Sequence, residues 1–275
     1  MNAFHLLQML LPDLTPKNSK LHFAITNGKE NPLDVYYQED FQEWQRQQLK
    51  RNFDRKYVVS FIAMPTPNLW LFAGVHLSDI PTQREDCIYY PLVEIQETKE
   101  LDGRLIISFD KKNVDNKFVR QSYLLTENWV EKLNVAEVLA QALDFAKFPS
   151  FKSVHISFSQ LKTIVKKSLS DWQSALSSVA GVYLIADKSS GKLYVGSATG
   201  EGGIWQRWAE YATNLHGNNR QLIELKKQFG DVHFENFYFS ILEIADTHSS
   251  ENEILVRESH WKNVLLTRQF GYNDN

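Results

Sequence analysis

The stretch that decides the fold of this chain is GVYLIADKSSGKLYVG, residues 181–196. Two apolar runs flank KSSG, a turn-forming sequence in which Gly191 can adopt the left-handed conformation. We therefore predict a β-hairpin. Each strand carries one tyrosine, Tyr183 or Tyr194, and each tyrosine belongs to a short Gly/Tyr triplet, GVY or YVG. The rest of the chain must explain why glycines bracket the two tyrosines.

Helical and strand patterns continue after the hairpin. Apolar spacing predicts a helix over 204–215, a second helix over about 219–229 and a long helix over about 250–266. Residues 236–244 alternate as a third strand. Ser250 and Glu253 form the S-x-x-E pattern of a capping box at the start of the long helix. These elements predict a small antiparallel sheet with flanking helices.

Four polar residues stand out in this frame. Arg207 and Tyr211 are four positions apart, so they share one helix face. Glu258 lies among apolar positions of the long helix, which turns it inward or to a groove edge; helix geometry alone also allows an exposed glutamate with an ion-pair partner. Asn273 ends the motif GYN, where the alternative is a frayed terminal turn.

Taken in order, GVY, YVG, Arg207, Tyr211, Glu258 and Asn273 resemble the signature of the GIY-YIG nuclease domain. The resemblance covers about residues 180–275 and places Val where both triplets of the family carry Ile. It implies an α+β fold, with a three-stranded antiparallel sheet flanked by helices.

The resemblance also implies a chemistry, the hydrolysis of phosphodiester bonds in DNA. Glu258 would hold one divalent metal ion, Mg²⁺ or Mn²⁺, since hard oxygen ligands with waters suit these ions. Arg207 would bind the phosphate and neutralise developing charge. Tyr183 would act as the general base, with Tyr194 and Tyr211 as hydrogen-bonding partners or phosphate contacts. Asn273 would position Glu258 or a tyrosine.

Further residues are candidates for substrate binding. Gly196 would let the backbone approach the phosphate. Lys192 and Ser197 lie near the hairpin. Lys166 and Lys167 belong to a basic stretch at 152–167 that contains no acidic residue, for which a solvated helix face is the alternative.

The sequence divides into three parts. We predict a mixed α/β domain with a curved antiparallel sheet or small barrel for residues 1–150. We predict a linker or connecting helix for residues 151–178 and the nuclease domain for residues 179–275. In the first part, helices are predicted at 3–10, 38–50 and 135–147, and strands at 20–26, 57–63, 69–76, 88–95 and 104–109.

The first domain would recognise DNA. It faintly resembles PUA-like domains, a superfamily that includes readers of modified bases. The resemblance offers Trp70, Phe72, Tyr89 and Tyr90 as the lining of a base pocket. The alternative is that these aromatic residues alternate along strands and fill the core.

Composition limits the partners. The net charge is −3, which argues against a protein that binds nucleic acid through a strongly basic surface. Cys87 is the only cysteine, so disulfide frameworks and cysteine zinc clusters are excluded and a reducing, cytoplasmic location is expected. The sequence has neither a run of about 18 apolar residues nor a signal-peptide pattern, so no membrane association is expected.

These features predict a metal-dependent DNA endonuclease of prokaryotic or phage origin, acting on double-stranded DNA in restriction or defence, with dependence on base modification left open. A repair or structure-specific nuclease is the alternative enzyme. A non-catalytic nucleic-acid-binding protein with a retained nuclease fold is the alternative of another class. Cleavage of both strands would call for a homodimer or sequential nicking, and a sequence-specific enzyme would need a companion methyltransferase.

Overall fold

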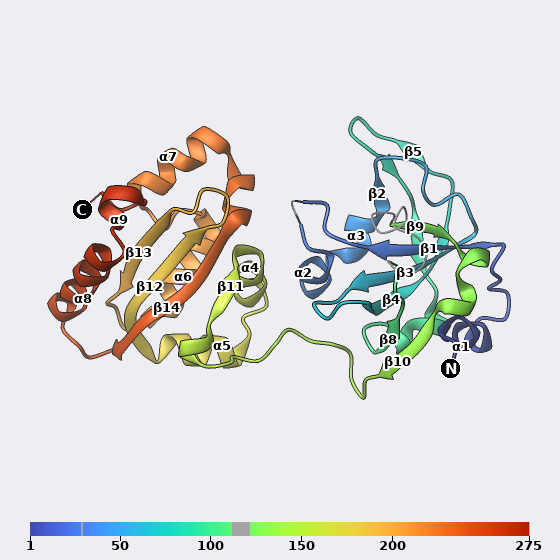
Figure 1. The fold of residues 1–275 in the computed structure, drawn as a ribbon, viewed down its shortest axis with the longest axis horizontal. Coiled ribbons are helices and arrows are strands. Elements are labelled where there is room, and N and C mark those ends of the chain that lie inside the picture. The colour runs from blue at the N-terminus through green and yellow to red at the C-terminus, as the bar shows by residue number, and fades with distance from the viewer. Residues whose placement is uncertain (29, 112–121, 275) are drawn as a thin grey trace. The chain divides into compact units, whose positions relative to one another are not determined.

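The computed structural model describes residues 1–275 except 29, 112–121 and 275. The chain divides into two compact units, Met1–Phe145 and Ala146–Asn275. The elements of both units are labelled in Figure 1. No helix in the described parts of the chain is long and apolar enough to cross a membrane.

The first unit is built around a mixed β-sheet. Its elements are α1 (Ala3–Leu10), β1 (Ser19–Ala24), α2 (Pro32–Tyr37), α3 (Phe41–Arg46), β2 (Gln47–Gln48), β3 (Tyr57–Ala63), β4 (Leu69–Ser78), β5 (Thr82–Gln83), β6 (Ile88–Tyr89), β7 (Leu92–Glu94), the 3₁₀ helix Gln96–Leu101, β8 (Leu105–Ser108), β9 (Tyr123–Leu125), the 3₁₀ helices Thr126–Asn128 and Val130–Lys132, and β10 (Asn134–Val138). Within the described residues, the main sheet has the order β10-β8-β4-β3-β1-β9, with β7 also paired to β4. A smaller sheet joins β2, β6 and β5.

This sheet corrects the prediction of an antiparallel sheet or barrel. β1 and β3 run parallel, because α2, α3 and β2 lie between them in the chain and return it to the starting end. The described strands form an open path from β10 to β9. The first unit therefore contains a curved mixed sheet, which is compatible with the predicted α+β class.

One predicted helix of the first unit is too long and another is wrong. The segment 38–50 breaks at Glu39, which has a φ of +65°, so only Phe41–Arg46 is helical there. The segment 135–147 instead begins in β10, where Val135 pairs with Ile107 of β8. A left-handed turn inside the first segment, and strand pairing with β8 in the second, override the helical spacing of the apolar residues. The helix at 3–10 is confirmed, and its N-cap is Asn2, which accepts from the amide of Phe4.

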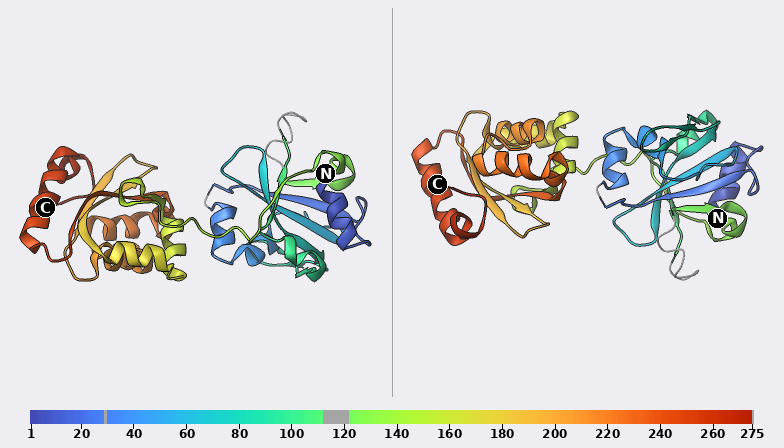
Figure 2. Two further views of the ribbon diagram at one scale, coloured as in Figure 1. Left: turned by 90° about the horizontal axis from the view of Figure 1, so that it is seen from below. Right: turned by 90° about the horizontal axis from the view of Figure 1, so that it is seen from above.

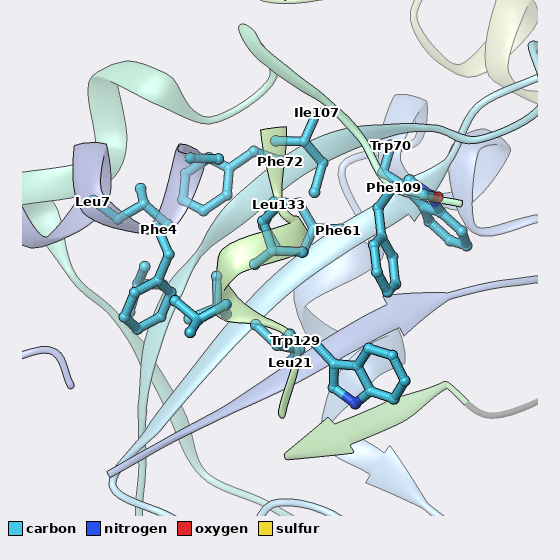
Figure 3. Close-up of a cluster of buried hydrophobic side chains, with 14 of the residues drawn as sticks. Phe4, Leu7, Leu21, Phe61, Trp70, Phe72, Ile107, Phe109, Trp129 and Leu133 are labelled. Atoms are coloured by element: carbon cyan, nitrogen blue, oxygen red, sulfur yellow. The ribbon is translucent and has the colours of Figure 1, made fainter. Parts of the chain in front are cut away.

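The main core of the first unit lies between the sheet and α1. Figure 3 shows Phe4, Phe61, Phe72, Trp70 and Trp129 converging there. Trp70 and Phe72 are thus core residues, and Tyr90 is buried in a second cluster beside Phe53. The core interpretation of these aromatics is confirmed, and Tyr89, whose ring lies under the Arg84 guanidinium, is the only partly exposed member of the four pocket candidates.

The second unit is a four-stranded antiparallel sheet between helices. Its elements are the 3₁₀ helix Phe151–Ser153, β11 (His155–Ser157), α4 (Phe158–Lys166), α5 (Ser170–Ser177), β12 (Val179–Asp187), β13 (Leu193–Ala198), α6 (Gly203–Asn214), α7 (Arg220–Phe229), the 3₁₀ helix Asp231–Asn236, β14 (Phe237–Asp246), α8 (Glu251–Val264) and α9 (Thr267–Phe270). Within the described residues, the strand order is β11-β14-β12-β13. The sheet is therefore one strand larger than the three-stranded sheet predicted.

The additional strand comes from the segment predicted as a linker. β11 pairs with β14, with Ile156 opposite Phe239, and α4 and α5 pack against α6. The segment 151–178 is thus part of the second unit. The strand that pairs with β11 lies about eighty residues further along the chain, which is why local sequence gave no sign of the pairing.

The predicted hairpin is confirmed as β12 and β13, with Gly191 at a φ of +73° in the turn. Helices cover this hairpin from two sides. Figure 2 shows the red α8–α9 segment on one side of the sheet and helices coloured yellow-green to orange on the other. α6 packs on β12 and β13, and α8 packs on the same two strands. β13 is the edge strand, so side chains on both of its faces lie near a helix.

Candidate active site

Gly196 and Tyr183 form the centre of the site. They are directly opposite each other in the β12–β13 ladder, so they occupy the same face of the sheet. A Cβ atom on Gly196 would overlap the Tyr183 hydroxyl and lie 2.5 Å from Cζ. Glycine at this position therefore makes room for the ring of Tyr183, which refines the expectation that Gly196 serves backbone approach to a phosphate.

Three residues on this face form a hydrogen-bonded group that we call the Arg207 cluster: Tyr183, Arg207 and Tyr211. The Tyr183 and Tyr211 hydroxyls are 3.1 Å apart. Arg207 Nε donates to the Tyr183 hydroxyl at 3.2 Å, and Nη1 donates to Glu210 at 2.6 Å. Arg207 and Tyr211 share one face of α6, as their spacing predicts, and both contact Tyr183 from that face.

Burial sets the protonation of the Arg207 cluster. Both tyrosines are fully buried. Burial, with a smaller effect of Tyr194, raises the pKa of Tyr183 well above its usual range, and burial raises the pKa of Tyr211 likewise. Burial opposes the charge of Arg207, but Tyr183 and Tyr211 outweigh it and raise the Arg207 pKa. The cluster is therefore two neutral phenols around a permanent cation.

Tyr194 differs from the other two tyrosines. It lies on the same sheet face, opposite Ile185, and is 6% exposed. Its hydroxyl makes no hydrogen bond to a described residue. It is also not one of the buried polar atoms that lack a partner, so the oxygen is exposed to solvent. Tyr194 therefore offers a hydroxyl that solvent can reach beside the Arg207 cluster.

Glu258 belongs to a second group, the Glu258 cluster, which also contains Ser197 and Lys262. One carboxylate oxygen of Glu258 accepts a short hydrogen bond from the Ser197 hydroxyl. The other lies 2.6 Å from Lys262 Nζ. Glu258 is only 8% exposed and Lys262 only 4%, so the ion pair is buried. The inward orientation predicted for Glu258 is confirmed, and its exposed alternative is wrong.

The two clusters lie on opposite faces of β13. Gly196 faces Tyr183 and α6, whereas the next residue, Ser197, faces Glu258 and α8, because successive strand residues point to opposite faces. No hydrogen bond or ion pair joins Tyr183, Tyr211 or Arg207 to Glu258 or Ser197. The shared feature is the edge strand, around which a bound polymer could contact both clusters.

The donor chemistry at Glu258 fits a hard divalent cation. A carboxylate with a neighbouring hydroxyl suits an ion that keeps several waters, as Mg²⁺ does. Among the described residues, no group of three or more His, Cys, Asp or Glu side chains could hold a metal. Glu258 would thus be the one protein carboxylate on the ion, and Lys262 already stands at one of its oxygens.

Asn273 has a different position from the one expected. Its Oδ1 accepts from the amide of Val195 at 2.9 Å, and its Nδ2 donates to the carbonyl of Val195 at 2.8 Å. These bonds fix the backbone of β13 between Tyr194 and Gly196. Asn273 is 4% exposed, so the frayed-turn alternative is wrong, and it acts on the strand and contacts neither Glu258 nor a tyrosine side chain by hydrogen bonds.

The lysine candidates lie outside both clusters. Lys192 is at the hairpin turn, with its Nζ over the ring of Tyr272 at 5.4 Å. Lys166 and Lys167 are at the carboxyl end of α4. Within the same basic stretch, Lys162 forms an ion pair with Glu235 at 2.5 Å, which removes part of its positive charge.

Sequence reasoning missed Lys262 and Asp187. Lys262 is four residues after Glu258, a spacing that predicts an ion pair on one helix face. Asp187 is 1% exposed and accepts from Ser189, Ser190 and Tyr272, with His233 Nε2 at 3.0 Å. It ties the hairpin turn to the carboxyl-terminal segment that carries Asn273. The signal for it was an acidic residue before two serines in a turn.

Part of the second unit is similar to a known family of catalytic domains and to two solved structures. The profile of the GIY-YIG catalytic domain matches residues 179–273. The chain is similar to the solved catalytic domain of the homing endonuclease I-TevI and to a mutant catalytic domain of intron endonuclease I-TevI. Each alignment has 27% identity and a TM-score of 0.29, and covers 35% of this chain and 98% or 94% of the solved one. No curated protein sequence matches the chain.

Residues 179–273 of the second unit are therefore a GIY-YIG catalytic domain. This match makes the chain an endonuclease. The PUA-like resemblance of residues 1–150 has no support from these comparisons.

Proposed function

We propose that this protein is a metal-dependent endonuclease that cleaves double-stranded DNA in restriction or defence. The observation that carries the proposal is the edge strand β13, which has the Arg207 cluster on one face and Glu258 on the other. A backbone phosphate at this edge would meet a fixed cation on one side and a carboxylate on the other. Phosphodiester hydrolysis needs both kinds of group.

Hydrogen bonds orient the Arg207 side chain so that it can bind a phosphate. Its Nε is bound to Tyr183 and its Nη1 to Glu210, and its Nη2 makes no hydrogen bond to a described residue. The side chain is 29% exposed, so this third nitrogen can reach a ligand. Because two nitrogens are already anchored, the guanidinium loses little freedom when it binds a phosphate oxygen. Its role is to hold the scissile phosphate and neutralise developing charge.

Tyr183 and Tyr194 have different proposed roles. Tyr183 would keep Arg207 aligned, since it is buried and its raised pKa keeps the hydroxyl protonated at neutral pH. Tyr194 would contact the attacking water or the phosphate, since its hydroxyl reaches solvent. We therefore move the proposed general-base role from Tyr183 to Tyr194. A general base must act in its deprotonated form, so the neighbouring cations must assist proton removal.

Glu258 would hold the divalent ion, with Ser197 orienting the carboxylate. When bound, such an ion stabilises negative charge on the phosphate and the leaving oxygen. The protein's own contribution is the fixed carboxylate, the hydroxyl that orients it and the strand that sets its distance from Arg207. Mg²⁺ is the proposed ion, and Mn²⁺ shares its preference for oxygen ligands.

The first unit would supply DNA recognition, because the net charge of −3 leaves the chain little general affinity for a phosphate backbone. Cys87 is a free thiol, which agrees with the proposed cytoplasmic site of action. Modification dependence would follow if the first unit reads a modified base. Double-strand cleavage would require either a homodimer or two sequential nicks, and a sequence-specific activity would require a protecting methyltransferase.

The test is cleavage in Mg²⁺ of unmodified plasmid, methylated genomic DNA and phage DNA with modified cytosine. Glu258→Gln removes the charge but keeps the shape, and Glu251→Gln is the matched control, because Glu251 is exposed on the same helix. We expect Glu258→Gln to abolish cleavage and Glu251→Gln to retain it. Absence of cleavage of all three substrates and of branched or nicked DNA by the wild-type protein would contradict the proposal. Preference for branched or nicked DNA would favour repair.

A further inference from the structure

A pair of stacked rings lies at the β11 edge of the sheet in the second unit. β11 runs beside β14 (Figure 1), and His155 of β11 pairs with Ser240 of β14. The His155 ring stacks on the ring of Tyr238, with 5.1 Å between the centroids and 16° between the planes. Nδ1 of His155 is hydrogen-bonded to the Ser240 hydroxyl at 3.0 Å. The stack and the hydrogen bond therefore fix the orientation of an imidazole that is exposed to solvent.

The stacked rings lie on the face of the sheet that also carries Glu258. Ser240 pairs with Leu184 of β12, and Leu184 is two residues from Val182, which pairs with Ser197. Residues two apart in a strand point to the same face. Because Ser197 bonds Glu258, the rings and the proposed metal ligand share one face. The Arg207 cluster and α6 lie on the other face.

Helices α8 and α9 pack on β12 and β13 of this face. Beyond them, over β11 and the beginning of β14, six half-buried or exposed residues form an accessible surface: His155, Ser157, Leu184, Ala186, Tyr238 and Ser240. None of the six is acidic. Glu243, further along β14, is paired with Arg257 of α8 at 3.2 Å. The accessible surface is therefore aromatic and hydroxyl-bearing, without negative charge.

Two exposed lysines border the stacked rings. Lys188 Nζ is 6.0 Å from the centroid of the Tyr238 ring. Lys152, from the basic stretch 152–167, belongs to the 3₁₀ helix that precedes β11 and contacts β14. Aromatic rings beside cations are the pattern of surfaces that bind nucleic acid, since bases stack on the rings and phosphates pair with the lysines. This surface is thus complementary to DNA in both shape of contact and charge.

The state of the DNA follows from the stacking. A paired base in a duplex is covered by its neighbours, so an exposed ring can stack only on a base that is unpaired or has left the helix. The place of that base follows from the sheet. His155 is three strands from Ser197 in the sheet order and about two residues along, which gives a separation of about 16 Å. At about 3.4 Å for each nucleotide of a duplex strand, this is about five base pairs.

We propose that His155, Tyr238 and Lys188, which we call the His155 platform, bind an unpaired nucleotide of the DNA substrate. Its base stacks on the outer face of the His155 ring, and its phosphate pairs with Lys188. This inference rests on the proposed function, since it takes DNA as the substrate and Glu258 as the place of cleavage. It defines the substrate further, as DNA whose duplex is open about five base pairs from the bond that is cut.

The experiment measures binding of the full chain to two fluorescent duplexes by anisotropy, in EDTA so that no cleavage occurs. The duplexes have the same sequence, but one contains a short bulge of unpaired thymines. We expect wild type to bind the bulged duplex at least about fivefold more tightly, the lower end of what stacking of one base contributes. His155→Ala should lose this preference, and His155→Phe should keep it, because a phenyl ring also stacks. His248→Ala is the control, because His248 is an exposed histidine outside the platform.

Equal affinity of wild type for the two duplexes would overturn the inference, as would a preference for the bulged duplex that survives in His155→Ala. Lys188→Ala provides a second measurement at an exposed side chain. The affinity for the bulged duplex is followed against salt concentration, and we expect the slope of the logarithmic plot to fall by about one in Lys188→Ala. Lys227→Ala, at a lysine paired with Glu224 on α7, should keep the wild-type slope. An unchanged slope in Lys188→Ala would overturn the inference.

These results are distinct from a failure of the proposed function, because binding in EDTA does not depend on cleavage. A wild-type protein that cleaves DNA in Mg²⁺ but binds both duplexes equally would refute the His155 platform and leave the proposed function in place. A wild-type protein that prefers the bulged duplex through His155 but cleaves no DNA would support the platform and refute the proposed function.

Discussion

Gly196 lies opposite Tyr183 in the β12–β13 ladder, and the Tyr183 ring fills the space in which a side chain at position 196 would begin. The glycine of the second triplet and the tyrosine of the first are therefore one packing unit. The ring of Tyr183 continues from this contact to Arg207 and Tyr211. This explains the glycine of the second triplet.

Replacing Gly196 with alanine should disturb the Arg207 cluster. The added Cβ would press on the Tyr183 ring and shift its hydroxyl away from Arg207 and Tyr211. Overpacking of this kind costs about 1–3 kcal/mol of the free energy of unfolding. We expect Gly196→Ala to show that loss in urea denaturation, together with a fall in single-turnover DNA cleavage.

The matched control for this change is Gly200→Ala, because the nearest atom to a Cβ there is Gln206 Oε1 at 3.8 Å. It should retain the stability and activity of the wild-type protein. Loss of activity in Gly196→Ala without loss of stability would contradict the packing role and favour backbone approach to the phosphate instead.

Local sequence predicted the hairpin and the shared helix face of Arg207 and Tyr211, because both follow from spacing. Tyr183 and Gly196 pair across a short turn, and Arg207 and Tyr211 share a helix face. The Ser250–Glu253 capping box was predictable for the same reason and is confirmed. In these cases the residues that interact are close in the chain.

Non-local contacts explain what local sequence could not predict. Residues of β11 adopt the strand conformation because they pair with β14. Val135 adopts it because it pairs with β8. The burial of Lys262 depends on the packing of α8 against the hairpin, so its spacing from Glu258 alone fits an exposed ion pair equally well. The two bonds between Asn273 and Val195 link residues 78 positions apart.

Asn273 should stabilise the edge strand that carries the site. Asn273→Ala removes both hydrogen bonds to Val195 and leaves a buried amide and carbonyl without partners, at about 1–3 kcal/mol for each group. We expect a marked fall in melting temperature and weaker cleavage. The adjacent Asp274→Ala is the control, because Asp274 is exposed. A melting temperature of Asn273→Ala equal to that of Asp274→Ala would show that the bonds contribute nothing.

Asp187 should make stability depend on pH. Burial favours its neutral form, but hydrogen bonds from Ser189, Ser190 and Tyr272 outweigh burial and lower the pKa of Asp187 below its usual range. Because the pKa of Asp187 is lower in the folded than in the unfolded state, its ionised carboxylate stabilises the folded protein at pH values above the unfolded-state pKa of about 3.9. This stabilisation is lost as the pH falls toward the folded-state pKa.

The measurement is urea denaturation of wild type and Asp187→Asn from neutral pH to about pH 3. We expect Asp187→Asn to be less stable by about 1–3 kcal/mol at neutral pH, with the difference shrinking below about pH 4. Asp246→Asn, at an exposed carboxylate of β14, is the control. A difference that is constant across this range would refute the account of the Asp187 pKa.

The three tyrosines of the site can be separated by removal of single hydroxyls. Tyr194→Phe should lower the single-turnover rate by about 10²–10⁴, the usual contribution of a general base. Its stability should stay close to wild type, because the Tyr194 hydroxyl bonds no described residue. Tyr183→Phe should instead lower stability and loosen Arg207, since it removes the bonds to Arg207 and Tyr211.

Tyr238→Phe is the control for both changes, because Tyr238 lies on β14 with its ring stacked on His155. It should retain both rate and stability. The pH–rate profile distinguishes the two roles further: Tyr194→Phe should lose the rising limb, in which the rate increases as the general base loses its proton, whereas Tyr183→Phe should keep this limb at a lower rate. The opposite outcome, with the limb lost only in Tyr183→Phe, would return the general-base role to Tyr183 despite its burial.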